Sequence, residues 1–571
     1  MKLRLILGGG GRIPSLFDKS RGVALEKIEN LFRRLEQLND IGAALSQEKN
    51  LDRLLEKILI AAQTISSADG GSLYLIEEGA RLRFAIMRND TLKIALGGTS
   101  GNDIPFYPIH LYKDDKPNNS MVAAYAAINQ CTVNIADAYT EAGFDFSGTR
   151  QFDQKTGYRS KSFLTVPMKN HEGEIIGVLQ LINSLAPDTR EILPFSEADQ
   201  RLAESLASQA AIALTNRALI TQLEELFESF IVLINTAIDE KSPYTGGHCQ
   251  RVPMLTMMLA EAVNATGEGP LASFNMTEND RYELKIAGML HDCGKVTTPV
   301  HVVDKGTKLE TIFDRISLIE TRFEVLKRDA EIEALRTRLA LAEAPEANEL
   351  GRHERQYGID QALREEMRQL DEDREFLHRC NIGGEFMPPE AQARVREIGR
   401  TYRWTDPSGH IANFLSEDEI NNLTIARGTL TAEERETINH HIVATIRMLE
   451  ALPWPKHLQN VSEYAGGHHE RMDGKGYPRG LLREQMSVQA RVMGIADIFE
   501  ALTAKDRPYK HGKTLSESLR ILGQFKLNGH IDPDLFDIFV RRKVYLRYAE
   551  QFLDPKQIDV VDEGAIPGYS P

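Results

Sequence analysis

The sequence predicts a multidomain protein: an α+β domain with an antiparallel sheet, then a long helix, then a region dominated by helices. Strand-like runs at residues 71–76, 82–87, 162–168 and 174–182 lie among helical patterns in the first third. Residues 195–238 keep a helical apolar pattern without any glycine or proline. Farther along the chain, apolar residues recur at three to four residue spacing, which is typical of helices.

In the first domain, which we place at residues 24–196, two strand-like runs flank Asn170 and Gly173. Asn and Gly favour a tight turn, so the sequence predicts a β-hairpin there. Strands with flanking helices indicate an antiparallel α+β fold.

The helix expected at residues 197–238 has an apolar stripe, formed by Leu202, Leu206, Ala210, Ile212, Leu219, Leu223, Leu226 and Phe230. Such a stripe on a long helix indicates a parallel two-stranded coil in a homodimer. A core helix packed within one chain is the alternative, and both stay open.

Composition limits the classes of protein and partner. A length of 571 residues corresponds to roughly three to four domains, and 42% apolar residues suffice for their cores. A net charge of −15 and a pI near 5.6 argue against a nucleic-acid polymer or an anionic membrane as main partner. Four scattered cysteines suit a reducing compartment. Because no apolar run approaches ~18 residues, we expect a cytoplasmic protein with residues 1–23 as a leader.

The segment from His468 to Pro478 carries the strongest chemical signal. It places His468 and His469 side by side, adds a carboxylate at Glu470 and ends in a glycine-rich turn. Neighbouring residues point in different directions on a helix or strand, so two adjacent imidazoles suit a backbone that bends around an ion. A surface or core role is the alternative for an isolated pair.

Other polar residues could complete such a site. His291 and Asp292 follow a helix-like apolar run, and Asp497 lies in the middle of an apolar helical pattern at residues 491–502. A buried carboxylate needs a cation or a full set of hydrogen bonds. Asp497 is therefore either a salt-bridged core residue or a metal ligand.

Taken together, the motifs resemble the HD-GYP family of metal-dependent cyclic-dinucleotide phosphodiesterases, within the HD superfamily. The resemblance covers residues 227–552 with one long insertion, and it implies an all-α catalytic domain at residues 239–309 and 428–552. The motif residues in chain order are His248, His291, Asp292, Lys295, His441, His468, His469, Glu470, Asp473, Tyr477, Pro478 and Asp497.

The resemblance also implies roles for these residues. One divalent ion would be held by His248, His291, Asp292 and Asp497, and a second by Asp292, His441, His468 and His469. Asp292 would bridge the two ions, for which iron or manganese is expected, and Asp292 and Lys295 would act in catalysis. The phosphates or bases of the substrate would be contacted by Lys295, Tyr477, Arg507 and Lys510. Glu470 and Asp473 would contact the metal-binding residues and not the ions, or would only form the turn.

Two departures from the family pattern matter. Members with a third metal carry a glutamate where this chain has Tyr244, so two ions are expected. Residues 310–427 are an insertion, in which two apolar stripes on either side of Pro345 predict two antiparallel amphipathic helices. Residues 380–416 are expected to be irregular, because they contain Gly383-Gly384 and Pro388-Pro389. The insertion could be a lid, a specificity element or a dimer contact, and residues 553–571 are expected to be a tail.

The first domain resembles a GAF domain. Phe152, Asp153, Thr156, Asn183 and Asp199 are similar to the pattern of GAF domains in cyclic-nucleotide phosphodiesterases. The chain departs from that pattern at Ser184 and Gln200. Binding of a cyclic nucleotide is therefore one hypothesis. Binding of another small molecule, or dimerisation alone, is the alternative.

The sequence thus predicts a sensor-regulated phosphodiesterase that hydrolyses cyclic di-GMP to pGpG, with onward cleavage to GMP left open. One alternative keeps the chemistry and changes the substrate to another cyclic dinucleotide, such as cyclic GMP-AMP. The other is a catalytically impaired scaffold that only binds a cyclic dinucleotide.

Overall fold

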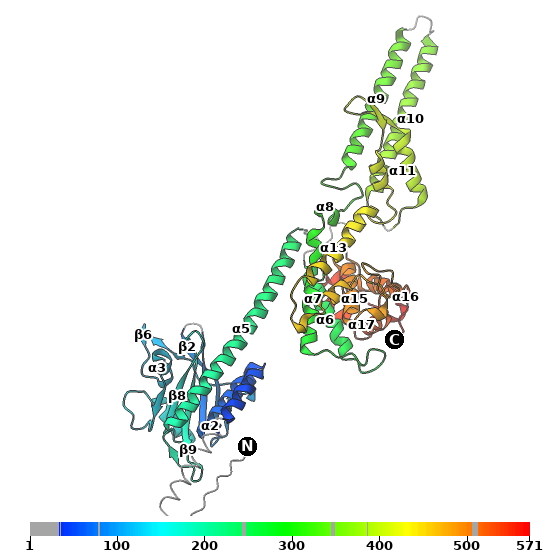
Figure 1. The fold of residues 1–571 in the computed structure, drawn as a ribbon. Helices are drawn as coiled ribbons and strands as arrows, with labels where there is room; N and C mark the ends of the chain where they lie inside the picture. Colours follow the sequence, from blue (N-terminus) through cyan, green and yellow to red (C-terminus); the bar gives the residue numbers. More distant parts are fainter. Residues whose placement is uncertain are drawn as a thin grey trace, which may run out of the picture. The chain divides into compact units, whose positions relative to one another are not determined.

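The computed structural model of the chain describes residues 34, 36–77, 80–241, 247–343, 349–384, 386–504 and 512–570. The chain divides into two compact units, Met1–Leu226 and Phe227–Pro571 (Figure 1). The leader expected at residues 1–23 lies outside the described residues. No helix in the described part of the chain has the length and apolar character that a membrane span needs.

The first unit is an α+β domain built on one antiparallel sheet. Its main strands follow the order β3-β2-β1-β9-β8-β7, with β10 paired to β9 and β4 to β2. The bounds are β1 (Ala68–Glu77), β2 (Arg81–Asn89), β3 (Ile94–Gly97), β4 (Ile109–His110), β7 (Val133–Ile135), β8 (Phe163–Lys169), β9 (Ile175–Leu185) and β10 (Ile192–Leu193), with a separate ribbon of β5 (Tyr112–Lys113) and β6 (Lys116–Pro117).

The predicted hairpin is confirmed at the β8–β9 turn, where the two strands pair antiparallel. Asn170 Oδ1 accepts hydrogen bonds from the backbone N–H groups of Glu172 and Glu174, at 3.0 and 2.9 Å. Gly173 has φ +82°, a conformation that glycine adopts without a steric cost. The α+β class expected for this domain is likewise confirmed.

Four helices accompany the sheet: α2 (Leu51–Ser66), α3 (Val122–Asn129), α4 (Ser147–Thr156) and the start of α5 (Glu197–Lys241). Asn50 begins α2, since its side chain accepts a hydrogen bond from Arg53 N. Apolar residues of α2 and of the first turns of α5 pack together with the sheet in one core. The expected long helix is confirmed as α5, which has 45 residues.

Apart from its inserted segment, the second unit is helical. Its helices are α6 (His248–Asn264), α7 (Glu278–Leu290), α8 (Val300–Val303), α13 (Ala432–Glu450), α14 (Val461–Gly466), α15 (Val488–Thr503), α16 (Leu515–Leu527), α17 (Pro533–Arg541) and α18 (Val544–Phe552). The core includes Phe499, Phe536, Phe539 and Tyr548, all fully buried. It also takes in Ile231 and Ile238 from the end of α5.

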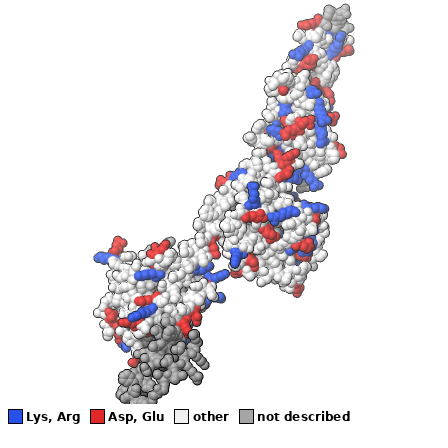
Figure 2. Space-filling view, viewed as in Figure 1, with Lys and Arg blue, Asp and Glu red and all other residues white. Residues whose placement is uncertain are grey.

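Residues 310–427 form a module with a core of its own. Its elements are α9 (Ile316–Glu343), α10 (Glu349–Asn381), α11 (Pro389–Thr401), β11 (Arg403–Thr405), β12 (Ile411–Asn413) and α12 (Glu417–Leu423). The predicted antiparallel helices are confirmed, because Lys327 pairs with Asp371 at 2.5 Å and Arg338 with Asp360 farther along. On the face that Figure 2 shows, both signs of charge are mixed along this hairpin.

One expectation for this module is wrong. Residues 380–416 were expected to be irregular, but they contain helix α11 and the ribbon of β11 and β12. The prolines that suggested irregularity lie at the start of the helix. Pro388 is the N-cap and Pro389 occupies the first helical position, where proline's missing N–H costs no hydrogen bond.

Candidate metal centre

Imidazoles and carboxylates from distant segments meet inside the second unit. His248 is the first residue of α6, and His291 with Asp292 follow the end of α7. His248 Nε2 lies 3.1 Å from Asp292 Oδ2 and 3.3 Å from Asp497 Oδ1, which comes from α15. His291 Nε2 lies 3.2 Å from the same Asp292 oxygen. These four residues form the first group.

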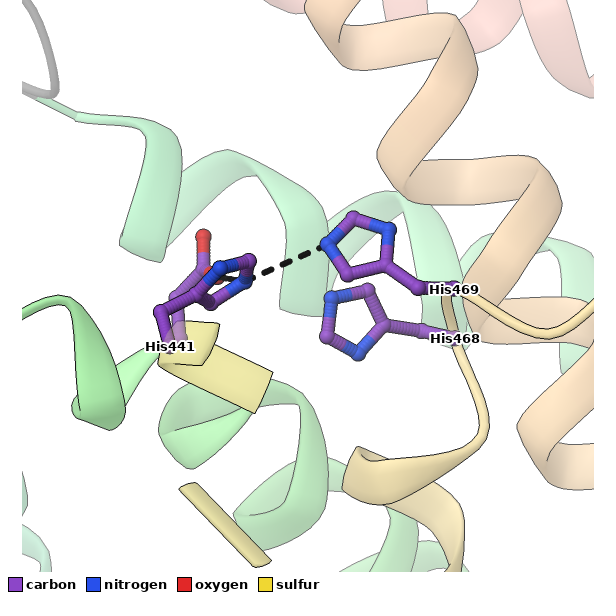
Figure 3. A group of neighbouring side chains, drawn as sticks. His441, His468 and His469 are labelled. Carbon is purple, nitrogen blue, oxygen red and sulfur yellow. Dashed lines mark hydrogen bonds and ion pairs between the residues drawn. The ribbon is translucent and has the colours of Figure 1, made fainter. Parts of the chain in front are cut away.

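The second group gathers on the other oxygen of Asp292. His441, from α13, places Nε2 3.2 Å from Asp292 Oδ1. Its Nε2 also lies 3.2 Å from His469 Nε2, the contact dashed in Figure 3. The His468 and His469 rings lie side by side, with centroids 4.1 Å apart. One potential ligand atom from each of Asp292, His441, His468 and His469 lies within 4.8 Å of all the others.

Three of these imidazoles are oriented by their own backbone. Nδ1 of His291, His441 and His468 donates a hydrogen bond to the carbonyl three residues earlier, at 2.7, 2.5 and 2.6 Å. A carbonyl oxygen only accepts, so Nδ1 carries a proton and Nε2 is the ring nitrogen directed into the group. His441 Nε2 lies 3.2 Å from Asp292 Oδ1, and in the neutral ring these are two acceptors that a cation between them stabilises.

Several buried polar atoms in the two groups lack a hydrogen-bond partner, which indicates that these atoms bind an ion. They are His291 Nε2, Asp292 Oδ1 and His468 Nε2. An unpaired buried polar atom costs roughly 1–3 kcal/mol, so several at one point are unfavourable without an ion. A mixed set of imidazole and carboxylate donors suits a divalent first-row metal. The residues present therefore fit a metal centre.

The protonation states of His468, His469 and Asp292 agree with this assignment. Burial lowers the pKa of His469 to about 4, and it holds the pKa of His468 well below its usual range. Burial alone would raise the pKa of Asp292, but the charge of Lys295 is the largest opposing effect and that pKa stays well below the usual range. Near pH 7 the two rings are neutral and Asp292 is ionised, as metal ligation requires.

The turn that holds Asp292 packs tightly against α13. A Cβ atom on Gly294 would lie 2.0 Å from the carbonyl oxygen of His441, so only glycine allows this approach. Gly294 N also donates a hydrogen bond to Thr445 Oγ1 at 2.9 Å. Lys295, in the same turn, places Nζ 2.5 Å from Asp292 Oδ2. This packing brings Asp292 to His441.

The remaining predicted residues lie around the centre or outside the described chain. Tyr477 stacks on His469 with ring centroids 4.8 Å apart. The buried Glu470 carboxylate accepts hydrogen bonds from the N–H groups of Arg479 and Leu481, and Asp473 binds Arg471 and Lys475 N. Both acids thus hold the turn that contains Tyr477. Arg507 and Lys510 fall outside the described residues, as does Tyr244.

Glu500 is the residue that sequence reasoning missed. It is 1% exposed and contacts His248 Nδ1 at 2.5 Å and Arg251 at 2.7 Å. A signal was available, because Glu500 lies three residues after Asp497 on the same face of a helix.

In the first unit, Phe152 lines a cavity of about 340 Å³, together with Tyr74, Phe84 and Tyr158. The other predicted ligand residues are engaged elsewhere. Asp153 accepts hydrogen bonds from Tyr139 Oη and Ser160 Oγ. Asn183 Oδ1 accepts hydrogen bonds from Lys161 N and Ser162 N. Asp199 pairs with Arg34 at 2.8 Å, and the exposed Thr156 hydroxyl donates to Phe152 O. Arg34 thus neutralises the charge of the Asp199 carboxylate.

Comparison with known families agrees with both units. The family described as GAF domain matches residues 50–214, and two families described as HD domain match residues 245–372 and 395–535. The chain therefore contains a GAF domain followed by a helical HD region, with the long helix α5 between them.

Several curated relatives share parts of this organisation. Cyclic di-GMP phosphodiesterase PA4108 of Pseudomonas aeruginosa is 47% identical over 114 residues, which cover 20% of this chain and 26% of the relative. The cyclic di-GMP phosphodiesterase of Thermotoga maritima is 34% identical over 188 residues, covering 29% and 48%. The 3'3'-cGAMP-specific phosphodiesterase 1 of Vibrio cholerae is 44% identical over 81 residues, covering 14% and 19%. The matches span less than half of each relative.

The geometry predicts a metal content that depends on Asp292. Protein prepared anaerobically with iron or manganese should hold about two ions per chain. Asp292→Asn removes the charge shared by both groups, so the content should fall well below one ion. Elemental analysis after dialysis measures the number of metal ions per chain. The control is Asp373→Asn, which changes a buried aspartate of the inserted module and should leave two ions bound. Equal contents in the two variants would contradict the assignment.

Proposed function

We propose that the protein is a metal-dependent phosphodiesterase of the HD-GYP type, which hydrolyses cyclic di-GMP to pGpG under control of its GAF domain. The observation that carries the proposal is the position of Asp292, whose two oxygens face separate imidazole groups. His248, His291, Asp292 and Asp497 would hold one ion, and Asp292, His441, His468 and His469 a second. Iron or manganese suits this donor set.

Each residue has a definable task in such a reaction. When bound, two ions lower the pKa of water and stabilise the attacking and leaving oxygens of a phosphoryl displacement. Lys295, whose pKa is raised by Asp292 against the effect of burial, stays charged and can neutralise substrate phosphate. Tyr477 presents a ring beside His469 at which a base can stack. Arg507 and Lys510 are proposed to add phosphate contacts.

Substrate identity rests on the relatives. Proteins named for cyclic di-GMP and proteins named for 3'3'-cGAMP both match this chain, so cyclic GMP-AMP is the alternative substrate. A scaffold without catalysis is less consistent with the site, because a binding role alone does not require imidazoles that are oriented by their backbone toward one bridging carboxylate.

A panel of cyclic dinucleotides with product chromatography tests the activity. Metal-loaded protein should convert cyclic di-GMP to pGpG faster than it converts cyclic GMP-AMP, and GMP would appear only if cleavage continues. His441→Ala should lower the rate at least ~100-fold, since it removes a ligand. His440→Ala, at the exposed neighbouring residue of α13, is the matched control. Wild-type protein without turnover, or an active His441→Ala, would reject the proposal.

We further propose that the GAF cavity binds a small planar ligand such as a cyclic nucleotide. Its wall of aromatic rings offers stacking surfaces, with polar atoms of Asn89, Gln180 and Ser160 among them. A ligand at 100-fold its dissociation constant should stabilise the domain by about 2.7 kcal/mol. Thermal unfolding with cyclic AMP and cyclic GMP tests this. A shift that Phe152→Ala abolishes supports the site, and no shift with either nucleotide rejects this ligand class.

Finally, we propose that the protein is a homodimer joined along α5. The structure divides the apolar stripe of this helix into parts. Leu202, Leu206 and Ala210 are buried in the core of the first unit, which fits packing within one chain. A second set stays between 45% and 64% exposed: Ile212, Leu219, Leu223, Leu226, Phe230 and Leu233.

The exposed set has the spacing of a coiled coil. From Ile212 to Leu233 the positions alternate by four and three residues when exposed Asn216 is included, which is the a/d pattern of a two-stranded seam. A single Asn at an a position fixes the register of such a pair. The seam is therefore suited to the same helix of a second copy.

Sedimentation analysis tests the dimer. Leu223→Lys removes two apolar side chains per dimer, each worth about 1.5–3 kcal/mol when buried. The dissociation constant should then rise at least ~100-fold. Glu224→Lys, at the neighbouring exposed residue, should leave the dimer intact. A wild-type chain that stays monomeric at micromolar concentration, or a Leu223→Lys chain that dimerises normally, would contradict the proposal.

A further inference from the structure

Glu500 links two helices that meet at the metal centre. It lies on α15 three residues after Asp497, and its carboxylate reaches α6. One oxygen, Oε2, lies 2.5 Å from His248 Nδ1, while the other, Oε1, accepts from Arg251 Nε at 2.7 Å. Both oxygens of a carboxylate that is 1% exposed are thus used on one imidazole and one guanidinium.

His248 differs from the other oriented imidazoles in what holds it. His291, His441 and His468 each follow a helical turn, whose carbonyl three residues earlier accepts from Nδ1. His248 is the first residue of α6, so no earlier turn of that helix can supply such a carbonyl. A side chain from another element has to orient the ring, and the Glu500 carboxylate is in place to do so.

We propose that Glu500 is a positioning residue for the first metal group, and that Arg251 keeps its carboxylate aimed at His248. With Nδ1–H bound to Glu500, His248 directs Nε2 toward Asp292 and Asp497, the oxygens 3.1 and 3.3 Å away. Acceptors behind a metal-bound imidazole fix its tautomer and strengthen it as a ligand. This role rests on the proposed metal-dependent function.

Arg251 makes the arrangement electrostatically possible. Asp292, Asp497 and Glu500 bring three carboxylates around one imidazole. The guanidinium lies 2.7 Å from Glu500 and offsets one of these charges inside the protein. The Glu500 carboxylate is thus held between the His248 ring and the Arg251 guanidinium.

Among the described residues of the two metal groups, Glu500 contacts His248 of the first group. Titration of metal-free full-length protein with Mn²⁺ should show two binding events for the wild type. In Glu500→Ala, one event should weaken roughly 10–100-fold, and the other should stay unchanged. Glu500→Gln keeps the shape of the side chain and should weaken the same event less. Arg251→Met should also weaken only that event.

A purely structural role predicts a different outcome. Glu283 supplies the matched control, because it is also buried and joins elements of the same unit by accepting from Asn460 N and Nδ2. Glu283→Gln should lower the unfolding temperature and leave both Mn²⁺ affinities unchanged. If Glu500→Ala does the same, Glu500 only ties α6 to α15 and the inference is overturned. If Glu500→Ala does not fold, the isosteric Glu500→Gln decides by the same criterion.

The same Mn²⁺ titration distinguishes failure of the proposed function from failure of the role proposed for Glu500. Wild-type protein that binds no Mn²⁺ would overturn the metal-dependent function and this inference together. Wild-type protein with two binding events, and Glu500 variants with the same two affinities, would overturn the inference alone. Loss of both events in Glu500→Ala, with the fold retained, would contradict the assignment of Glu500 to one group.

Discussion

The second unit depends on an ionised carboxylate, that of Asp292, held inside a helical core. Taking such a charge out of water costs several kcal/mol unless cations and hydrogen-bond donors surround it. Lys295 supplies one cation, and His248, His291 and His441 each place Nε2 within 3.2 Å of one of the two oxygens. His468 and His469, in the turn after α14, complete the second group. The 3-10 turn after α7 (Cys293–Thr297) and the close approach of its Gly294 to α13 bring these elements together.

Much of the fold could be predicted from the sequence, because its signals are local. Alternation and turn residues located β8, β9 and their hairpin, and spacing of apolar residues located α5, α9 and α10. The spacing of apolar residues does not show whether the apolar face of a helix packs within its own chain or against a second copy. The stripe of α5 reads as continuous in sequence, yet Leu206 is buried within its own unit and Leu223 is 64% exposed. Helix α11 was missed because proline was taken as a breaker.

The candidate site was accessible to sequence reasoning only where motif residues carry their own chemistry. The pairs His291-Asp292 and His468-His469 could be recognised, and the structure brings them to one point. Glu500 belongs to no such pair, and its importance comes from a contact with His248 across 252 positions of sequence. Lys295 and Asp292 are only three residues apart in the sequence, whereas the backbone orientation of the imidazoles needed coordinates.

The proposed function requires that the Asp292 carboxylate hold two ions where α6, α7, α13 and α15 meet the turn after α14. Anomalous X-ray diffraction from crystals grown with manganese measures this directly. The account predicts two anomalous peaks roughly 3.5–4 Å apart, with one oxygen of Asp292 on each and His248 and His441 on opposite sides. A single peak, or Asp292 turned away from both, would contradict it.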